Sequence, residues 1–320
     1  MNHSTTRFLL AALTLGTGIL RSADFSSEFG NVHDRVWAGE DYWANPMEDW
    51  MVLDRRLVCV RSGANRNVHL LTYGLSDKKP NAAFSVSVRL GMEQGSPKHG
   101  SAGFLIGVLD QETRDPRASL LFGKGLAVGV KASGKLFIGS KVADQALSSL
   151  EDFMLRFEAT PDKRKGFYSL RIIALEAETG KELSRLSWQV AKNDSLVGNV
   201  AIGCNLLSEP KVKGALKLAR FWFSDWKLSG EKVEARPDLA FGPILYAMHT
   251  LSRGILNLTA QMPPLGAKEA KSLRLDAKDA EGRWQKTANA TINPLSRTAT
   301  FSIEGWDDTR DVSYRIAFDD

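Results

Sequence analysis

The chain has 320 residues, of which 43% are hydrophobic and 25% charged, and its formal net charge is +5. These values are those of an ordinary soluble globular protein, and the length suffices for two domains that each bury a core. Basic residues are scattered among acidic ones and form no runs, so we expect no nucleic-acid or polyanion partner.

The N-terminus begins with a polar segment, MNHSTTR, followed by the apolar run FLLAALTLGTGIL. A run of this length is typical of the core of a secretory signal peptide and is too short to span a bilayer comfortably. We therefore expect residues 1–23 to be a signal peptide ending at Ala23, with no transmembrane segment left after its removal. The mature protein would be periplasmic or extracellular; the alternative is an uncleaved N-terminal anchor.

Short segments of alternating apolar residues follow one another along the chain. In the glycine-rich stretch 99–139, Phe104, Ile106 and Val108 share one face, which is the period-two pattern of a β-strand. A tight turn at Asp54-Arg55 is expected to form a hairpin. Further strands are expected at 69–73, 84–90, 126–130, 136–138, 153–157, 168–172, 186–190, 200–206 and 219–230. Such spacing without helical patterns predicts an all-β, two-sheet sandwich over residues 24–230.

Residues 231–242 lose the alternation and contain Pro237, so we expect a linker there. Beyond it, Leu256, Leu258 and Ala260 begin a new alternating series that continues to the end of the chain. Its size and rhythm predict a second, smaller sandwich of the immunoglobulin or fibronectin type III kind over residues 243–320.

The two cysteines, Cys59 and Cys204, each lie within an apolar strand pattern. Export would make a disulfide between them chemically feasible. Equally, each suits a buried free cysteine that packs as a small hydrophobic residue. Their separation in sequence leaves both alternatives open.

A search for catalytic motifs finds none. The chain lacks the D-x-H, G-D-x-x-D and G-N-H motifs of metallophosphoesterases and the G-x-S-x-G motif of serine hydrolases. The histidines lie far apart, without the spacing of a zinc site, at His3, His33, His69, His99 and His249.

Acidic residues near two tryptophans are the remaining candidates for carbohydrate chemistry. Glu48, Asp49 and Asp54 lie close in sequence to Trp43 and Trp50. Two carboxylates beside a sugar-binding cleft would suit a glycosidase, and the tryptophans would suit a lectin-like module that stacks sugar rings. Solvated loop acids beside core-packing tryptophans explain the same pattern.

One acidic loop could hold calcium. Asp110, Glu112 and Asp115 lie together in the segment DQETRD, with a spacing that suits a structural calcium ion. A polar hairpin loop without a metal explains the same residues. No other cofactor is expected.

Several segments resemble known families. RRLVC, RNVHLLT, GSAGFLIGV, LLFGKGLAVGV and FWFSDWKLSG resemble the concanavalin A-like or laminin-G-like sandwich of secreted bacterial proteins. FGPILYAMHTLSRGILNLTAQMPPLG and WDDTRDVSYRI are similar to the region before the catalytic domain of PhoD-like alkaline phosphatases. This resemblance implies phosphoester hydrolysis at a metal centre that would lie after Asp320, so no catalytic or metal-binding residue is transferred to this chain.

We therefore expect an exported, non-catalytic accessory or binding region that positions a substrate, a glycan or a catalytic partner. Its partners would be a glycan, a ligand bearing a phosphoester, or a catalytic phosphatase domain. The alternative is a carbohydrate-active protein, a lectin-like module or a glycosidase, that uses the loop around Trp43 and Trp50.

Overall fold

The computed structural model describes residues 24–162, 166–191, 196–207, 218–266, 268–309 and 311–318. The expected signal peptide therefore lies outside the described residues. Within these ranges no helix is long and apolar enough to cross a membrane.

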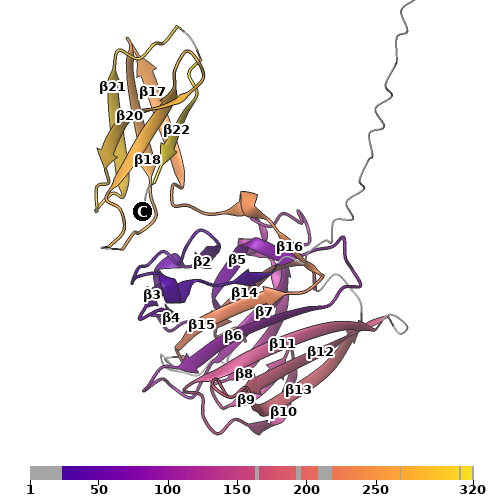
Figure 1. Ribbon diagram of the computed structural model, residues 1–320. Coiled ribbons are helices and arrows are strands. Elements are labelled where there is room, and N and C mark those ends of the chain that lie inside the picture. The colour runs from indigo at the N-terminus through magenta and orange to yellow at the C-terminus, as the bar shows by residue number, and fades with distance from the viewer. Residues whose placement is uncertain are drawn as a thin grey trace, which may run out of the picture.

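The prediction of an all-β fold with a two-sheet sandwich is confirmed. The described residues form two eight-stranded antiparallel sheets that stack to make the larger unit (Figure 1). The first sheet runs in the order β13 (Glu182–Ala191), β12 (Phe167–Leu175), β11 (Phe153–Asp162), β6 (Phe84–Met92), β15 (Phe221–Ser229), β4 (Arg56–Cys59) and β3 (Trp50–Leu53), with β1 (Phe25–Ser26) also on β15. The second runs in the order β10 (Lys141–Ala146), β9 (Lys135–Ile138), β8 (Lys124–Lys131), β7 (Ser101–Leu109), β14 (Gly198–Cys204), β5 (Arg66–Leu75) and β16 (Val233–Ala235), with β2 (Tyr42–Asn45) also on β5.

Alternation along each strand explains how the core forms. In β11, Phe153, Leu155 and Phe157 point between the sheets and are at most 1% exposed. The alternate residues, Met154, Arg156 and Glu158, lie on the outer face. Burial of these apolar side chains supplies the main driving force that holds the sheets together.

The predicted turn at Asp54-Arg55 is confirmed. It joins β3 to β4, and both turn residues have positive φ angles, 48° and 64°. Two consecutive residues of this conformation match the right-handed twist of the flanking strands, so the hairpin closes without splaying.

The part of the chain that follows forms two three-stranded sheets. One has the order β17 (Tyr246–Ser252), β18 (Ile255–Gln261), β21 (Thr298–Glu304), and the other β20 (Trp284–Thr291), β19 (Ser272–Lys278), β22 (Tyr314–Ala317). Leu258, Leu275 and Phe301 belong to its own hydrophobic core, separate from that of the larger unit. Short helical segments are α1 (Ser119–Phe122), η1 (Phe29–Asn31), η2 (Met47–Asp49) and η4 (Pro237–Leu239).

Residues 231–242, which were expected to be a linker, include a short strand of the larger sandwich. This strand, β16, pairs with β5, and Val233 is buried. The strand is too short for alternation to reveal it, because three residues show hardly more than one repeat of the pattern.

Polar contacts join the two units. The Trp37 backbone N–H donates to the carbonyl of Pro264 over 3.3 Å, and the guanidinium of Arg35 pairs with the buried carboxylate of Glu269. The same carboxylate accepts a hydrogen bond from the backbone N–H of Gly266. The smaller unit is thus fixed to the larger one through a charge pair withdrawn from water.

Candidate functional site

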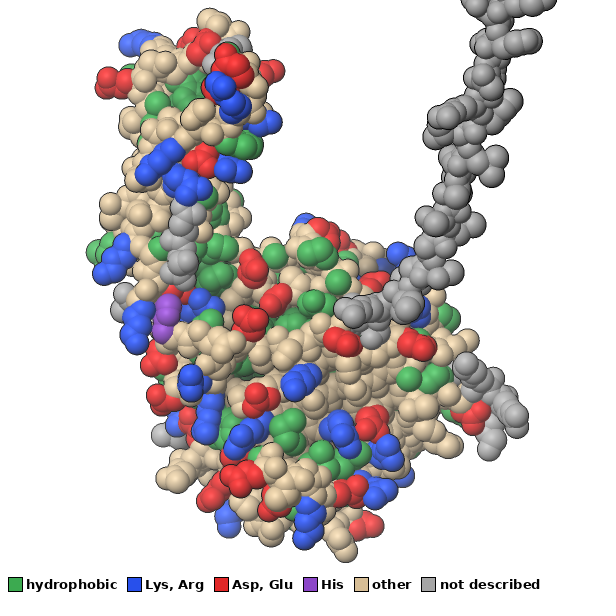
Figure 2. Space-filling model, in the orientation of Figure 1, with side chains coloured by type: hydrophobic (Ala, Val, Ile, Leu, Met, Phe, Trp, Pro, Cys, Tyr) green, Lys and Arg blue, Asp and Glu red, His purple; other side chains and the backbone are tan. Residues whose placement is uncertain are grey.

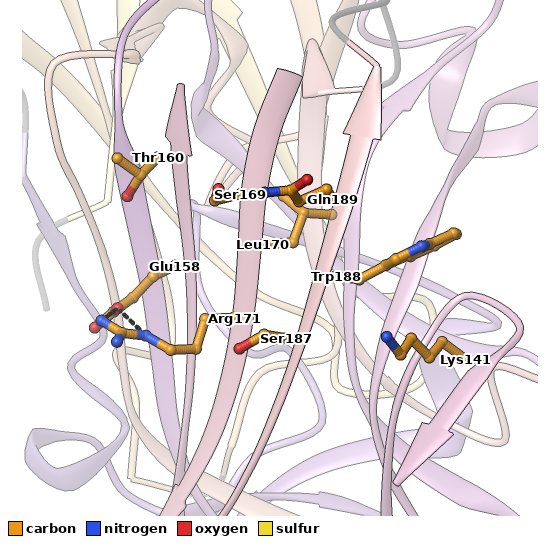
Figure 3. Close-up of a pocket in the computed structure, with 9 residues that line it drawn as sticks. All are labelled: Lys141, Glu158, Thr160, Ser169, Leu170, Arg171, Ser187, Trp188 and Gln189. Atoms are coloured by element: carbon orange, nitrogen blue, oxygen red, sulfur yellow. Dashed lines mark hydrogen bonds and ion pairs between the residues drawn. The ribbon is translucent and has the colours of Figure 1, made fainter. Parts of the chain in front are cut away.

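A cavity of about 610 Å³, lined mostly by polar residues, lies along β13, which is an edge strand of the first sheet. Its lining comes from four strands, β10 to β13. Figure 3 shows these side chains along the strands. They are Lys141, Glu158, Thr160, Ser169, Leu170, Arg171, Ser187, Trp188 and Gln189. The volume falls within the range of small-ligand sites.

Strand register places most of these residues in two short rows. Glu158 lies opposite Arg171, which lies opposite Ser187. Two residues further along each strand, Thr160 lies opposite Ser169, which lies opposite Gln189. Because side chains alternate between faces, all six project from the outer face of the sheet. They present hydroxyl, amide, carboxylate and guanidinium groups on a rigid surface.

Charge on this face is held in place by ion pairs. The Arg171 Nε–H donates to Glu158 Oε2 over 3.0 Å, and Arg156 Nε lies 3.1 Å from the second oxygen of the same carboxylate. Exposed ion pairs contribute little stability. Their effect here is to orient the Arg171 guanidinium, which has more N–H groups than this pair uses.

Trp188 lies on the opposite face of β13 from Ser187 and Gln189 (Figure 3). Its ring approaches Gly139, where an added Cβ would come within 3.2 Å of the indole. This contact packs the edge strand against the second sheet. An aromatic residue does lie on the outer face: Phe167 is 38% exposed and precedes Ser169 by two positions in β12.

The structure separates the residues of the Trp43 to Trp50 loop. Trp50 is 1% exposed and packs against Phe223 with ring centroids 5.9 Å apart, so it offers no face to a ligand. Asp49 is also buried and forms ion pairs with Arg66 and, at 3.8 Å, with Arg61.

Two of the candidate residues in that loop do reach the surface. Glu48 is exposed, and Trp43 is half-buried with its ring centroid 6.4 Å from that of His69. His69 itself is buried, and burial lowers the pKa of its imidazole to about 4, so the ring is neutral near pH 7. The loop therefore supplies one accessible carboxylate and one accessible indole, and no pair of carboxylates flanking a cleft.

The acidic loop between β7 and β8 uses its carboxylates internally. Asp110 accepts hydrogen bonds from the backbone N–H and the hydroxyl of Thr113, which lower the pKa of its carboxyl group. Asp115 accepts from the backbone N–H groups of Arg117 and Ala118. Among the described residues, no group of three His, Cys, Asp or Glu side chains could hold a metal ion. Oxygens of Asp110 and Asp115 accept hydrogen bonds from donors of their own loop, so a calcium ion at this loop stays a prediction.

Sequence reasoning missed the outer face of β11 to β13 as a site. It identified these strands from their inward apolar residues, and the polar residues between them looked like ordinary solvent-facing positions. Only the register aligns them into rows. Figure 2 shows acidic and basic side chains intermixed over the visible face of the larger unit, so charge alone does not mark a site either.

Comparisons with known proteins find structural likeness only. No family model matches the chain, and no curated protein matches it. Among solved structures, it is similar to the basic winged bean lectin with Tn-antigen (12% identity, TM-score 0.43, 66% of this chain and 98% of that one). It is also similar to lectin I from Ulex europaeus, in complex with the methyl glycoside of α-L-fucose (12%, 0.40, 65% and 98%). A third is the PL-14 alginate lyase from Aplysia kurodai (9%, 0.37, 62% and 89%).

Proposed function

We propose that this chain is a non-catalytic glycan-binding protein whose ligand lies on the outer face of β11, β12 and β13. The observation that carries the proposal is the pair of side-chain rows, Glu158–Arg171–Ser187 and Thr160–Ser169–Gln189, beside the cavity. Sugars present many hydroxyl groups that both donate and accept hydrogen bonds, and these rows offer both kinds of partner.

Rigidity supports the same proposal. The residues stand on hydrogen-bonded strands, so their backbone positions are already fixed before a ligand binds. Phe167 at the end of the face provides an apolar ring of the kind that packs against the C–H face of a sugar. The described lining of this cavity has one carboxylate, Glu158, whereas glycoside hydrolysis needs two, so this face suits binding.

A glycan array followed by titration calorimetry with the best ligand tests the proposal. Ser169→Ala and Gln189→Ala should each weaken binding roughly tenfold, since each removes about one hydrogen bond to the ligand. Ser87→Ala is the matched control, because Ser87 lies on the outer face of β6 in the same sheet but outside the cavity. Loss of binding in Trp43→Ala with none in Ser169→Ala would move the site to the Trp43 loop. No binding to any glycan would refute the proposal.

The similarity to the region before the catalytic domain of PhoD-like phosphatases supports a second candidate, an accessory role beside a phosphatase. It rests on the sequence segments quoted above. The purified chain should then hydrolyse neither a phosphomonoester nor a phosphodiester with added divalent metal, yet should bind the catalytic domain. Turnover that survives repurification contradicts this role.

A further inference from the structure

The two cysteines come from strands in different sheets and meet in the core between them. Cys59 ends β4 in the first sheet, and Cys204 ends β14 in the second. Both side chains are 0% exposed and belong to one hydrophobic core, and both are free thiols here. The sequence contains no other cysteine, so an intramolecular bridge has only one pairing.

Hydrogen bonds hold the ends of these two strands side by side. The backbone N–H of Asn65 donates to the carbonyl of Asn205 over 2.8 Å, and the Asn205 side-chain amide donates to the carbonyl of Gly63 over 2.9 Å. Residues just after Cys59 are thereby tied to the residue directly after Cys204.

The two thiols interact within this core. The Cys204 thiol interacts with that of Cys59 and with the backbone of Phe221, while Cys59 Sγ donates to the carbonyl of Arg61 over 3.3 Å. Burial, and then the interaction with Cys59, raises the pKa of the Cys204 thiol. In the folded, reduced protein the reactive thiolate is therefore scarce.

We propose that Cys59 and Cys204 form a disulfide that joins the two sheets. The oxidant is a small-molecule or protein disulfide. One cysteine thiolate attacks a sulfur of that disulfide and expels one thiolate, giving a mixed disulfide. The second cysteine thiolate then displaces the other half. Two cysteine thiols are oxidised to one disulfide, and one external disulfide is reduced to two thiols, which take up the two protons.

Refolding the full chain from its reduced, denatured state in oxidised and reduced glutathione tests the proposal, because thiol access is then not limiting. After refolding, the protein is denatured again and alkylated. The oxidised wild type should take no label, should take two labels per chain after reduction, should run as a monomer without reductant, and should carry no glutathione adduct by intact mass. Its unfolding temperature should exceed that of the reduced protein by several degrees.

The variants Cys59→Ala and Cys204→Ala calibrate the assay, since each should take one label per chain after reduction, and any label lost in the oxidised variant reports a glutathione adduct that intact mass reveals. The result for the wild-type chain does not depend on whether either variant folds. Two labels per chain in the oxidised wild type, or a bridge between two chains, would overturn the proposal.

Discussion

Trp43 and Trp50 are close in sequence, but the fold treats them differently. Trp50 opposes Cys59 in the β3–β4 hairpin and is enclosed by the core, whereas Trp43 lies on β2 beside His69 and keeps part of its ring in solvent. An aromatic ring stabilises a protein through the contacts it makes on all sides. The two positions should therefore differ in their contribution to stability.

Trp50→Ala should lower the free energy of unfolding by about 3 to 5 kcal/mol, since it removes a fully buried ring and leaves a cavity. Trp43→Ala, the control, should cost less than about half as much because its ring is already partly hydrated. Urea denaturation followed by circular dichroism measures both. Equal losses would mean that the exposure of these rings does not govern their contribution.

His69 should make stability depend on pH. Its folded pKa is about 4, against 6.5 for the exposed group, because burial disfavours the charged imidazolium. Above pH 6.5 the His69 imidazole is neutral in both the folded and the unfolded chain, so its contribution to the free energy of unfolding is constant. Between pH 6.5 and 4 only the unfolded chain gains the proton, so the free energy of unfolding should fall by about 3 kcal/mol.

His69→Gln should remove this part of the pH dependence, whereas His99→Gln should retain it because His99 is exposed. Urea midpoints measured at intervals from pH 7 to pH 4 make the comparison. An unchanged slope in His69→Gln would show that other groups cause the loss.

At the scale of elements, hydrogen bonds within the loop between β7 and β8 organise its backbone. Asp110 and Asp115 cap successive backbone N–H groups, and the Ser119 hydroxyl donates to the Asp115 carbonyl over 2.7 Å as α1 begins. The carboxylates replace solvent as partners for these N–H groups. They therefore shape the loop through hydrogen bonds.

Asp110→Ala should lower the unfolding temperature by a few degrees, and by the same amount in calcium as in EDTA. Glu112→Ala is the control, since its exposed side chain lies in the same loop. Scanning calorimetry distinguishes the cases. A clear rise in the wild-type unfolding temperature on adding calcium, lost in Asp110→Ala, would instead establish a calcium site here.

At the scale of the whole molecule, Glu269 couples the two units. Its side chain is 1% exposed and pairs with Arg35, while His33 Nε2 lies 3.9 Å away. Arg35 also lies over the Trp37 ring, 5.0 Å from the centroid. A buried charge that loses its partner is costly, because neither water nor another group compensates it.

Glu269→Ala should therefore destabilise the junction by about 3 kcal/mol and speed proteolytic cleavage between the two units. Glu182→Ala removes an exposed ion pair with Arg185 on an edge strand and should cost less than about 1 kcal/mol. Limited proteolysis and urea denaturation provide the two readouts. Identical behaviour of the two variants would rule out a coupling role for Glu269.

The sequence by itself determined most of the strands and which of their faces are buried. Phe153, Leu155 and Phe157 show this, because every second side chain of a strand lies on the same face, and apolar side chains on one face place that face against a core. The turn at Asp54-Arg55 could also be predicted from neighbouring residues alone. Four of the described strands escaped this reasoning: β10 and β17, the second of which has no buried face, and the short β1 and β16, which lack a full repeat.

Tertiary structure alone decided what those segments do together. Register sets Arg171 between Glu158 and Ser187, and sheet stacking brings Cys59 to Cys204 and encloses Trp50. Partners far apart in sequence meet only through long-range pairing and packing. A strand pattern specifies which way a side chain faces but not which strand lies beside it, so the polar rows and the cysteine pair could not be read from alternation.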